Sequence, residues 1–320
     1  MKPQDSSLPH SSQTPEGASA PEEVYAPEGA HANASLDTLT AHLEHPSSEK
    51  GKNIPFNREE LKSIIARLED DISTGRWVTA DYASTDLKLM PALVDQANRK
   101  YPDMRLQLAA SSHDFALALK EAIENGVQSS RFIIYTKDRG IHFSVIDHQT
   151  IDDKTSVIFF EPTTLNNMKP AVLALRTQLA LKAHELPNCS FAMVEMDIQR
   201  SSSECGMFSL ALAKKLHTES QKLERLHKDN VKGVLCKPDT PLPAEKLDPY
   251  LPTTFYKHVQ GRRRLGEYLK ANPEAAQEKV NKKGETLTER FERSLVATET
   301  KTVSVSQHRK RATEYKSLMM

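Results

Sequence analysis

The sequence predicts an α+β fold, because strand-forming runs are grouped in the middle of the chain while helical patterns precede and follow them. Three short runs rich in β-branched and aromatic residues, Arg131–Thr136, Ile141–Asp147 and Thr155–Phe160, are separated by turn-forming residues, which is typical of a meander. A fourth strand is expected at Phe191–Gln199. Strands grouped in this way do not fit a regular βαβ array.

The first helix is predicted from its two ends and its apolar spacing. Asn57 followed by Glu60 matches a capping box, in which each side chain accepts a hydrogen bond from the other residue's backbone N–H. Apolar residues then recur at helical spacing from Leu61 to Ile72. Gly75 supplies the residue type that ends helices.

Further helices follow from the same kind of pattern. The second and third helices precede the strands; the second contains Pro91, and the third is followed by Gly126. A basic helix ends the chain. The expected ranges are Asp86–Tyr101, His113–Asn125, Pro170–His184, Gly206–Leu216 and Ser306–Leu318.

The first 53 residues differ in composition from the rest of the chain. They contain no Ile, Phe or Trp, and carry eight acidic residues against three lysines, a net charge of −5. Such a segment cannot bury enough apolar surface to offset the entropy of ordering, so disorder is predicted. It is interpreted as an export or chaperone-binding leader, the partner being a secretion chaperone; the alternative is a linker or a poorly ordered terminus.

Whole-chain composition excludes several classes of protein. Lys+Arg and Asp+Glu both number 43, so no global charge favours nucleic acid or membrane binding. The chain has no run of 18 apolar residues that could span a membrane, and its first thirty residues lack the apolar stretch of a secretory signal peptide. Three cysteines, Cys189, Cys205 and Cys236, are too few and odd in number for a disulfide framework, and indicate a reducing compartment. No metal site is expected.

The segment from Asp197 to Phe208 carries the strongest chemical signal. It leaves a predicted strand, crosses a polar loop and reaches Cys205, which is followed by Gly206 and a helix. A cysteine at a helix N-terminus meets exposed N–H groups and the positive end of the helix dipole, both of which favour the thiolate. A thiolate nucleophile also needs a base and a group that orients the base. His142 on one predicted strand and Glu161 at the end of the next could supply them.

Each of these residues also has a structural interpretation. A cysteine before an apolar helix is more often buried packing, the class to which Cys189 and Cys236 are assigned. A histidine on a strand is more often structural, and Glu161 before Pro162 could simply end a strand. Taken together, in the order His, Glu, Cys, they favour a nucleophilic site.

Positive charge is concentrated at the end of the chain. Residues 255–320 carry 15 Lys+Arg against 8 Glu and no Asp, a net charge of +7. From charge alone this region is a solvated basic face. The alternative is a phosphate site, because converging cations in one pocket need an anionic ligand to be stable.

Several stretches make the chain resemble the YopJ family of bacterial type III effector acetyltransferases, from about Leu61 to the C-terminus. That family has a fold similar to cysteine proteases of the ubiquitin-like-protease type. The matching stretches are Glu-Asn-Gly-Val-Gln-Ser-Ser-Arg-Phe-Ile (124–133), Ile-His-Phe-Ser-Val-Ile-Asp (141–147), Phe-Phe-Glu-Pro (159–162), Val-Glu-Met-Asp-Ile-Gln-Arg-Ser-Ser-Ser-Glu-Cys-Gly (194–206), Phe-Tyr-Lys-His-Val-Gln-Gly (255–261) and Asn-Lys-Lys (281–283).

The resemblance implies a catalytic mechanism. The family's triad falls on His142, Glu161 and Cys205, and Gln199 stands where a glutamine of the related proteases helps to form the oxyanion hole. Cys205 would take acetyl from acetyl-CoA, and His142, oriented by Glu161, would then activate a Ser or Thr hydroxyl of the target protein.

The resemblance also implies two anionic ligands, acetyl-CoA and the activator inositol hexakisphosphate. Residues assigned to cofactor binding are His142, Arg200, Ser201, Lys215, Lys257, His258, Arg309 and Lys310, with Arg200 and Ser201 placed in the CoA pocket. His308–Arg311 as a whole is expected at the activator.

The expected organisation is a leader at 1–53, a catalytic core at 54–254 and a basic regulatory segment at 255–320 that completes the CoA and polyphosphate sites. By resemblance the protein is a virulence effector, secreted through type III secretion into the host cytoplasm, that acetylates host MAP kinase kinases and inhibitor-of-κB kinases. Two alternatives stay open: a cysteine protease or deubiquitinase with the same triad, and an effector that binds kinases without chemistry.

Overall fold

The computed structural model describes residues 54–138, 140–186, 188–297 and 302–320. The predicted leader, residues 1–53, lies outside this described part. The α-helices of the described residues are α1 (Arg58–Thr74), α2 (Ala83–Lys100), α3 (Ser112–Glu124), α4 (Met168–Ala183), α5 (Cys205–Thr218), α6 (Glu224–Val231), α7 (Ala244–Leu247), α8 (Arg262–Ala271), α9 (Leu287–Arg293) and α10 (Ser306–Ser317). Their strands are β1 (Leu106–Ala109), β2 (Ser129–Thr136), β3 (His142–Ile151), β4 (Lys154–Glu161), β5 (Cys189–Glu195), β6 (Leu295–Ala297) and β7 (Thr302–Ser304).

A mixed five-stranded sheet in the order β1-β2-β3-β4-β5 forms the centre of the fold. The predicted meander is confirmed: β2, β3 and β4 pair antiparallel, while β1 and β5 add to the two edges in parallel. The predicted fourth strand is β5, which ends at Glu195, earlier than expected, so that the residues after it are free to form the loop that leads to Cys205.

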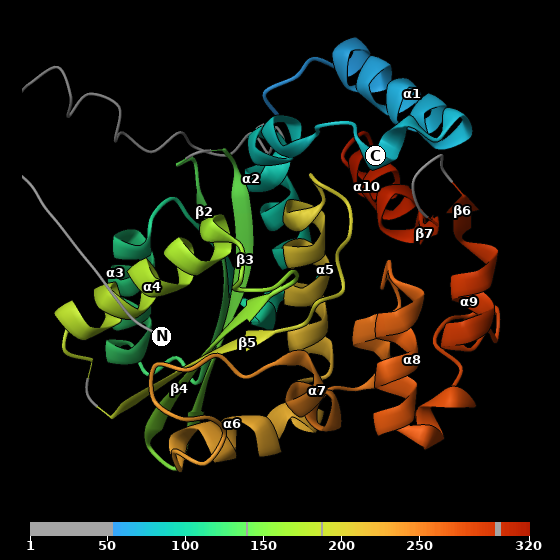
Figure 1. The fold of residues 1–320 in the computed structure, drawn as a ribbon. Coiled ribbons are helices and arrows are strands. Elements are labelled where there is room, and N and C mark those ends of the chain that lie inside the picture. The colour runs from blue at the N-terminus through green and yellow to red at the C-terminus, as the bar shows by residue number, and fades with distance from the viewer. Residues whose placement is uncertain (1–53, 139, 187, 298–301) are drawn as a thin grey trace, which may run out of the picture. The chain divides into compact units, whose positions relative to one another are not determined.

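Alternate side chains of the central strands pack against different helices. Ile133, Val145 and Phe160 belong to one core with α2 and α5, whereas Phe132, Ile146 and Phe159 belong to a second core with α3 and α4. This alternation is the period of two expected of a strand buried on both faces. Figure 1 shows α3 and α4 on one side of the sheet and α5 on the other. The predicted α+β class is confirmed, with helices on both faces of the sheet.

The predicted helix ends are well reproduced. Asn57 and Glu60 form the capping box of α1, and Gly75 ends the helix with φ 76°. In α3, Ser111 caps the N-terminus and Gly126 follows the helix with φ 70°. Pro91 lies inside α2, which begins three residues earlier than predicted. These elements form where local capping and apolar spacing agree.

The chain beyond Pro238 is helical with loops, as expected, but also contains the β6–β7 hairpin, which the sequence analysis missed. The C-terminal helix α10 packs against α1 and α5, so the end of the chain lies beside the helix that begins at Cys205 (Figure 1). The last basic helix therefore belongs to the packed core around the site.

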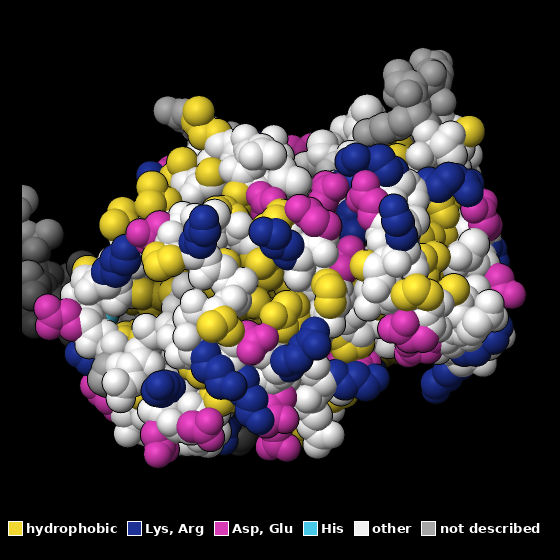
Figure 2. All heavy atoms as spheres, turned by 60° about the horizontal axis from the view of Figure 1, so that its bottom comes forward, with side chains coloured by type: hydrophobic (Ala, Val, Ile, Leu, Met, Phe, Trp, Pro, Cys, Tyr) yellow, Lys and Arg dark blue, Asp and Glu magenta, His cyan; other side chains and the backbone are white. Residues whose placement is uncertain are grey.

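Lys and Arg side chains are interspersed with acidic and apolar ones over the face shown in Figure 2, in line with the zero net charge. Among the described residues, no helix combines the length and apolar character needed to cross a membrane.

Candidate active site

The three residues of the predicted triad all lie at the ends of secondary-structure elements. His142 begins β3, Glu161 ends β4, and Cys205 begins α5. In the antiparallel β3–β4 pair, Val145 is opposite Phe160, so continuing the register brings Ser144 opposite Glu161 and places His142 two residues away on the same face. The structure therefore brings together residues that are far apart in the sequence.

The Glu161 carboxylate is fully buried and held by four hydrogen bonds. Its Oε2 accepts from His142 Nε2 at 2.9 Å and from Ser144 Oγ at 2.7 Å. Its Oε1 accepts from the backbone N–H and the hydroxyl of Thr163, at 2.9 and 2.7 Å. This set of donors fixes the orientation of the carboxylate, which in turn fixes the imidazole.

The imidazole of His142 lies between an acid and a thiol. Burial disfavours its protonation, but the charge of Glu161 and hydrogen bonds with Cys205 and Glu161 outweigh that effect and raise the pKa of His142 to about 10. Because Nε2 faces Glu161, Nδ1 is the nitrogen left for the thiol. The arrangement favours an imidazolium beside the sulfur, which stabilises a thiolate.

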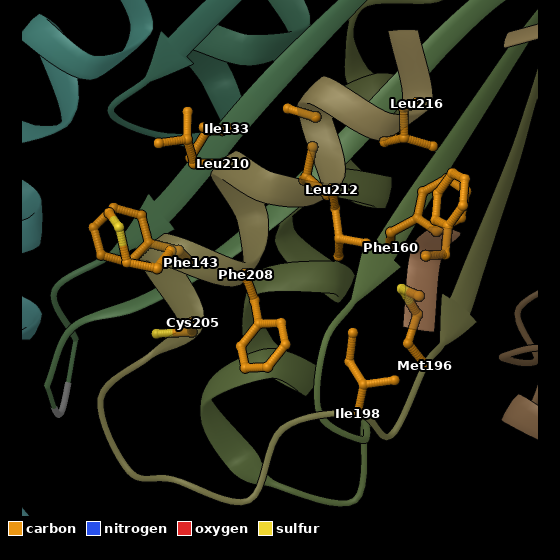
Figure 3. Packing of buried hydrophobic residues seen from close by; sticks show 14 of the residues in the cluster. Ile133, Phe143, Phe160, Met196, Ile198, Cys205, Phe208, Leu210, Leu212 and Leu216 are labelled. Atoms are coloured by element: carbon orange, nitrogen blue, oxygen red, sulfur yellow. The ribbon is translucent and has the colours of Figure 1, made fainter. Parts of the chain in front are cut away.

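Cys205 lies at the N-terminal end of α5, and its side chain is almost fully buried. Figure 3 shows its sulfur at the start of the helix, with the loop from Ile198 leading round to it and Phe208 one turn further along. The first N–H groups of a helix have no partners within the helix, so those at the start of α5 can stabilise negative charge that develops near the sulfur. The site can therefore form and stabilise an acyl-thioester.

Gln199 lies in the loop before Cys205 and is also buried. Its Nε2 donates to the carbonyl oxygen of Ser201 at 2.8 Å, and within the described part of the chain its Oε1 has no hydrogen-bond partner. A primary amide carries two N–H donors, so one remains for an oxyanion. The oxyanion role of Gln199 remains a prediction.

Arg200 and Ser201, assigned to CoA from the sequence, are engaged within the protein. Arg200 makes a two-point ion pair with Asp197, at 2.8 and 2.9 Å. Ser201 is buried and donates its hydroxyl to Glu204 Oε2 at 2.5 Å. Their assignment to the CoA pocket gains no support from this geometry.

Four of the remaining assigned residues line one cavity of about 570 Å³ between α2, α5 and the C-terminal segment: Lys215, Lys257, His258 and Lys310. Its wall also includes the apolar side chains of Ile198 and Phe208, from the nucleophile loop and helix. Burial, followed by the positive charges of Lys215, Arg290 and Lys310, lowers the pKa of Lys257 to about 8. Burial and neighbouring cations likewise hold the pKa of His258 well below its usual value. Neighbouring positive charges thus oppose the protonation of Lys257 and His258, as expected of a site built for an anion.

A second cavity of about 370 Å³ shares His258, Arg290, Lys310 and Thr313 with the first. The charged residues of its lining are all basic: Lys282, Lys283, Arg290, Arg293, Arg309 and Lys310. Arg309, the last assigned residue, therefore lies here. Arg290 and Arg293 escaped the sequence analysis, because isolated arginines in a short helix carry no distinctive spacing.

Two members of the basic His308–Arg311 cluster do not join these cavities, so the expectation for the cluster as a whole is wrong. His308 and Arg311 are fully buried, and Arg311 makes a two-point ion pair with Asp86 of α2 at 3.0 Å. The reason is helical geometry: neighbouring residues of α10 face in different directions, so Arg309 and Lys310 reach the cavities while Arg311 points inward.

Gln307 was also missed by the sequence analysis. Its side chain is fully buried and lines the larger cavity, yet neither its Oε1 nor its Nε2 has a hydrogen-bond partner among the described residues. Because unpaired buried polar atoms are costly, this amide is placed to bind a ligand that offers both a donor and an acceptor. A lone glutamine in a helix gives no signal in a sequence.

A Ser–His–Asp arrangement lies elsewhere in the core. His227 of α6 bonds Ser156 Oγ at 2.8 Å and Asp147 Oδ2 at 3.0 Å. All three side chains are fully buried, and Asp147 also pairs with Arg131 at 2.8 Å. No substrate can reach these groups in this state, so the set anchors α6 to the sheet.

Comparison with known proteins gives a consistent picture. The family model described as YopJ Serine/Threonine acetyltransferase matches residues 61–317. The serine/threonine-protein acetyltransferase YopJ of Yersinia pestis is 55% identical over 272 residues, which are 85% of this chain and 94% of that protein. The protein of the same name from Yersinia pseudotuberculosis is 54% identical over the same shares.

Two solved structures extend the comparison. The structure described as AvrA delL154 with IP6 and CoA has a TM-score of 0.80 and 50% identity, and the match covers 83% of this chain and 99% of that one. The complex of HopZ1a with IP6 and CoA has a TM-score of 0.64 at 17% identity, covers 82% of this chain and 98% of that one, and supports the fold alone.

Proposed function

The chain belongs to the YopJ family of serine/threonine acetyltransferases, and from that premise we propose how its own residues carry out acetyl transfer. The observation that carries the proposal is the hydrogen-bonded series Glu161, His142 and Cys205 at the ends of three elements. A carboxylate, an imidazole and a thiol in this order form the nucleophilic arrangement of an acyl-transfer enzyme.

In the first step the Cys205 thiolate forms a bond to the carbonyl carbon of acetyl-CoA, and the bond from that carbon to the CoA sulfur breaks. The departing sulfur takes the proton from His142. In the second step His142 accepts the proton of a Ser or Thr hydroxyl, whose oxygen attacks the acetyl-cysteine and releases the thiolate. Backbone N–H groups at the start of α5, with the second N–H of Gln199, stabilise the oxyanion of both steps.

We place CoA in the larger basic cavity. It combines cations for the phosphates, the apolar side chains of Ile198 and Phe208, and the unpaired amide of Gln307. CoA offers phosphates, an apolar arm and amide groups, so each part of the lining has a counterpart. The relative AvrA, 50% identical to this chain, has been solved with CoA, which supports CoA as a ligand.

We assign the smaller cavity to an inositol polyphosphate activator. Its charged lining consists of Lys and Arg side chains, and Arg290 and Lys310 contribute to both cavities. A polyphosphate would offset their mutual repulsion and so stabilise the arrangement of Arg290 and Lys310 in the CoA cavity. The solved structure of AvrA with IP6 supports this ligand class.

We further propose that the acetylated proteins are host MAP kinase kinases and related kinases, and that acetylation blocks their phosphorylation. The protein would reach them by type III secretion, with residues 1–53 as the export leader and chaperone-binding segment. Residues 54–254 would form the catalytic core and 255–320 the regulatory segment. Family membership supports this scheme.

The test is mass spectrometry of a purified MAP kinase kinase after incubation with the full chain and acetyl-CoA, with and without inositol hexakisphosphate. Acetyl groups on Ser or Thr hydroxyls are expected only when the polyphosphate is present. Cys205→Ala should abolish the transfer, whereas the matched variants Cys189→Ser and Cys236→Ser should retain it. Labelling of Cys205 by a ubiquitin-type probe without any acetylation would instead support a protease.

A further inference from the structure

The loop between β5 and Cys205 is held by a side chain from the C-terminal segment. Gln260 Oε1 accepts from the backbone N–H groups of Arg200 and Ser201, at 2.5 and 2.9 Å. Its Nε2 donates to Glu204 Oε2. Its backbone N–H donates to the carbonyl oxygen of Ile198 at 2.9 Å. One fully buried residue thus fixes both ends of the loop that delivers the nucleophile.

A second residue of the same segment, Arg311 in α10, holds the end of this loop from the other side. Its Nη2 donates to the carbonyl oxygen of Ser203 at 2.7 Å, two residues before the nucleophile. Its guanidinium also pairs with Asp86 and lies 3.7 Å from Glu204. Tyr315, one turn further along α10, donates to Asp86 at 2.5 Å, so the anchor of Arg311 is itself fixed.

Close packing leaves this arrangement little room to adjust. A Cβ on Gly206, next to the nucleophile, would lie 3.1 Å from Asp86 Oδ2. A Cβ on Gly261, next to Gln260, would lie 3.2 Å from Arg200 Nε. The loop, α2 and the C-terminal segment are therefore in direct contact around the start of α5.

We propose that Gln260 and Arg311 are positioning residues for Cys205, through which docking of the C-terminal segment sets the conformation of residues 199–204. The inference rests on the proposed function for its kinetic consequences. Both residues act on the loop backbone and on Glu204, and neither lines the two basic cavities. Their loss should therefore impair the chemistry of the thiol more than the binding of acetyl-CoA.

The decisive variant is Gln260→Glu, which keeps the size of the side chain and an acceptor for the two loop N–H groups. It replaces the donor to Glu204 with a carboxylate oxygen. The titratable and charged groups that face this point are Glu204 of the loop, His308 and Arg311 of α10, and Asp86 of α2 behind Arg311. The new carboxyl would lie in contact with Glu204, so the two should share a proton at low pH and repel at high pH.

We expect kcat of Gln260→Glu at pH 8 to fall roughly 100-fold while the KM for acetyl-CoA stays within about threefold. The ratio of variant to wild-type kcat should recover about tenfold or more at pH 6, as the shared proton is taken up. The alkylation rate of Cys205 by iodoacetamide should show the same loss and recovery. Arg311→Lys, which keeps the charge but not the two-point geometry, should lower kcat and alkylation without the recovery at low pH.

The matched control is Tyr268→Phe, which removes a buried hydroxyl bonded to the Leu251 carbonyl at 3.1 Å, away from the loop. The melting temperatures of all variants show whether a loss of kcat comes only from a loss of stability. The inference would be overturned if the loss of kcat in Gln260→Glu were the same at every pH. It would also be overturned if that loss were no larger than the loss in Tyr268→Phe at matched stability. If wild-type enzyme transfers no acetyl group but alkylation still responds as expected, the proposed function fails and the positioning role stands.

Discussion

At the scale of single residues, the site depends on an ion pair that burial alone would oppose. The buried His142 imidazole gains a proton because Glu161 supplies the negative charge, and Glu161 in turn depends on donors from Ser144 and Thr163. The protonated imidazole is then available beside the sulfur before any substrate binds. The enzyme thus meets the cost of separating charge during folding rather than during each turnover.

Glu161→Gln removes this charge and keeps the shape of the side chain. We expect kcat to fall by roughly 10²–10⁴, because the variant no longer stabilises the imidazolium. The pKa of His142, followed by NMR of the ring nitrogens, should fall well below about 10. An unchanged turnover would mean that Glu161 only ends a strand.

The same substitution has a defined effect on the pH dependence of stability. Because folding raises the pKa of His142 from 6.5 to about 10, the stabilisation is fully present below pH 6.5 and is lost as the pH rises through 10. The difference in unfolding free energy between wild type and Glu161→Gln should therefore narrow over this range. Urea denaturation at several pH values measures it.

At the scale of elements, the start of α5 requires a residue without a side chain. An added Cβ at Gly206 would meet Asp86 and Met90 at 3.1–3.3 Å, and Asp86 is held by Arg311 and Tyr315. We expect Gly206→Ala to destabilise the protein by about 1–3 kcal/mol and to lower kcat, because α5 must shift away from α2. Urea unfolding and steady-state kinetics check both effects.

Gly266, in the exposed face of α8, is the matched control. No atom of the residues that the structure describes lies within 4 Å of a Cβ added there, so Gly266→Ala should stabilise the protein by roughly 0.5–1 kcal/mol through helix propensity. If Gly206→Ala behaved like Gly266→Ala, the close approach of α5 and α2 would have no energetic importance.

At the scale of the whole molecule, the basic cavities make ligand binding a proton-linked event. With a pKa of about 8, Lys257 is largely neutral at pH 9 in the unliganded protein. CoA bound in the cavity that Lys257 lines should raise that pKa through its phosphates, so binding at pH 9 is expected to take up about one proton. Calorimetry in buffers of different ionisation enthalpy measures the uptake, and Lys257→Met should reduce it. Heats that are independent of the buffer would contradict this assignment.

Much of this architecture could be predicted from local patterns. The capped helices α1 and α3 and the central meander were located within a few residues, and the ends of β3, β4 and α5 pointed to the triad. The short strand β1 and the hairpin β6–β7 escaped, because three or four residues carry too little periodicity and depend on their partners.

The supporting residues around the triad could not be predicted from the sequence. Gln260 reaches Glu204 across 56 positions, and Arg311 reaches Asp86 across 225. No local spacing reveals such contacts, and charge clustering grouped Arg311 with Arg309 and Lys310 although it points elsewhere. Only the packing of α10 against α1 and α5 distinguishes Arg311, which faces the core, from Arg309 and Lys310, which face the cavities.

The division of α10 between a cavity side and a core side has an evolutionary consequence. Lys310 lines the cavities while the next residue, Arg311, pairs with Asp86 in the core. Deleting or inserting one residue within the helix would turn everything beyond it by about 100°, exchanging cavity residues for core residues. Point substitutions can be accepted one position at a time, whereas a change of length would disturb ligand binding and core pairing in a single event. Among natural relatives, α10 should therefore vary in sequence but not in length.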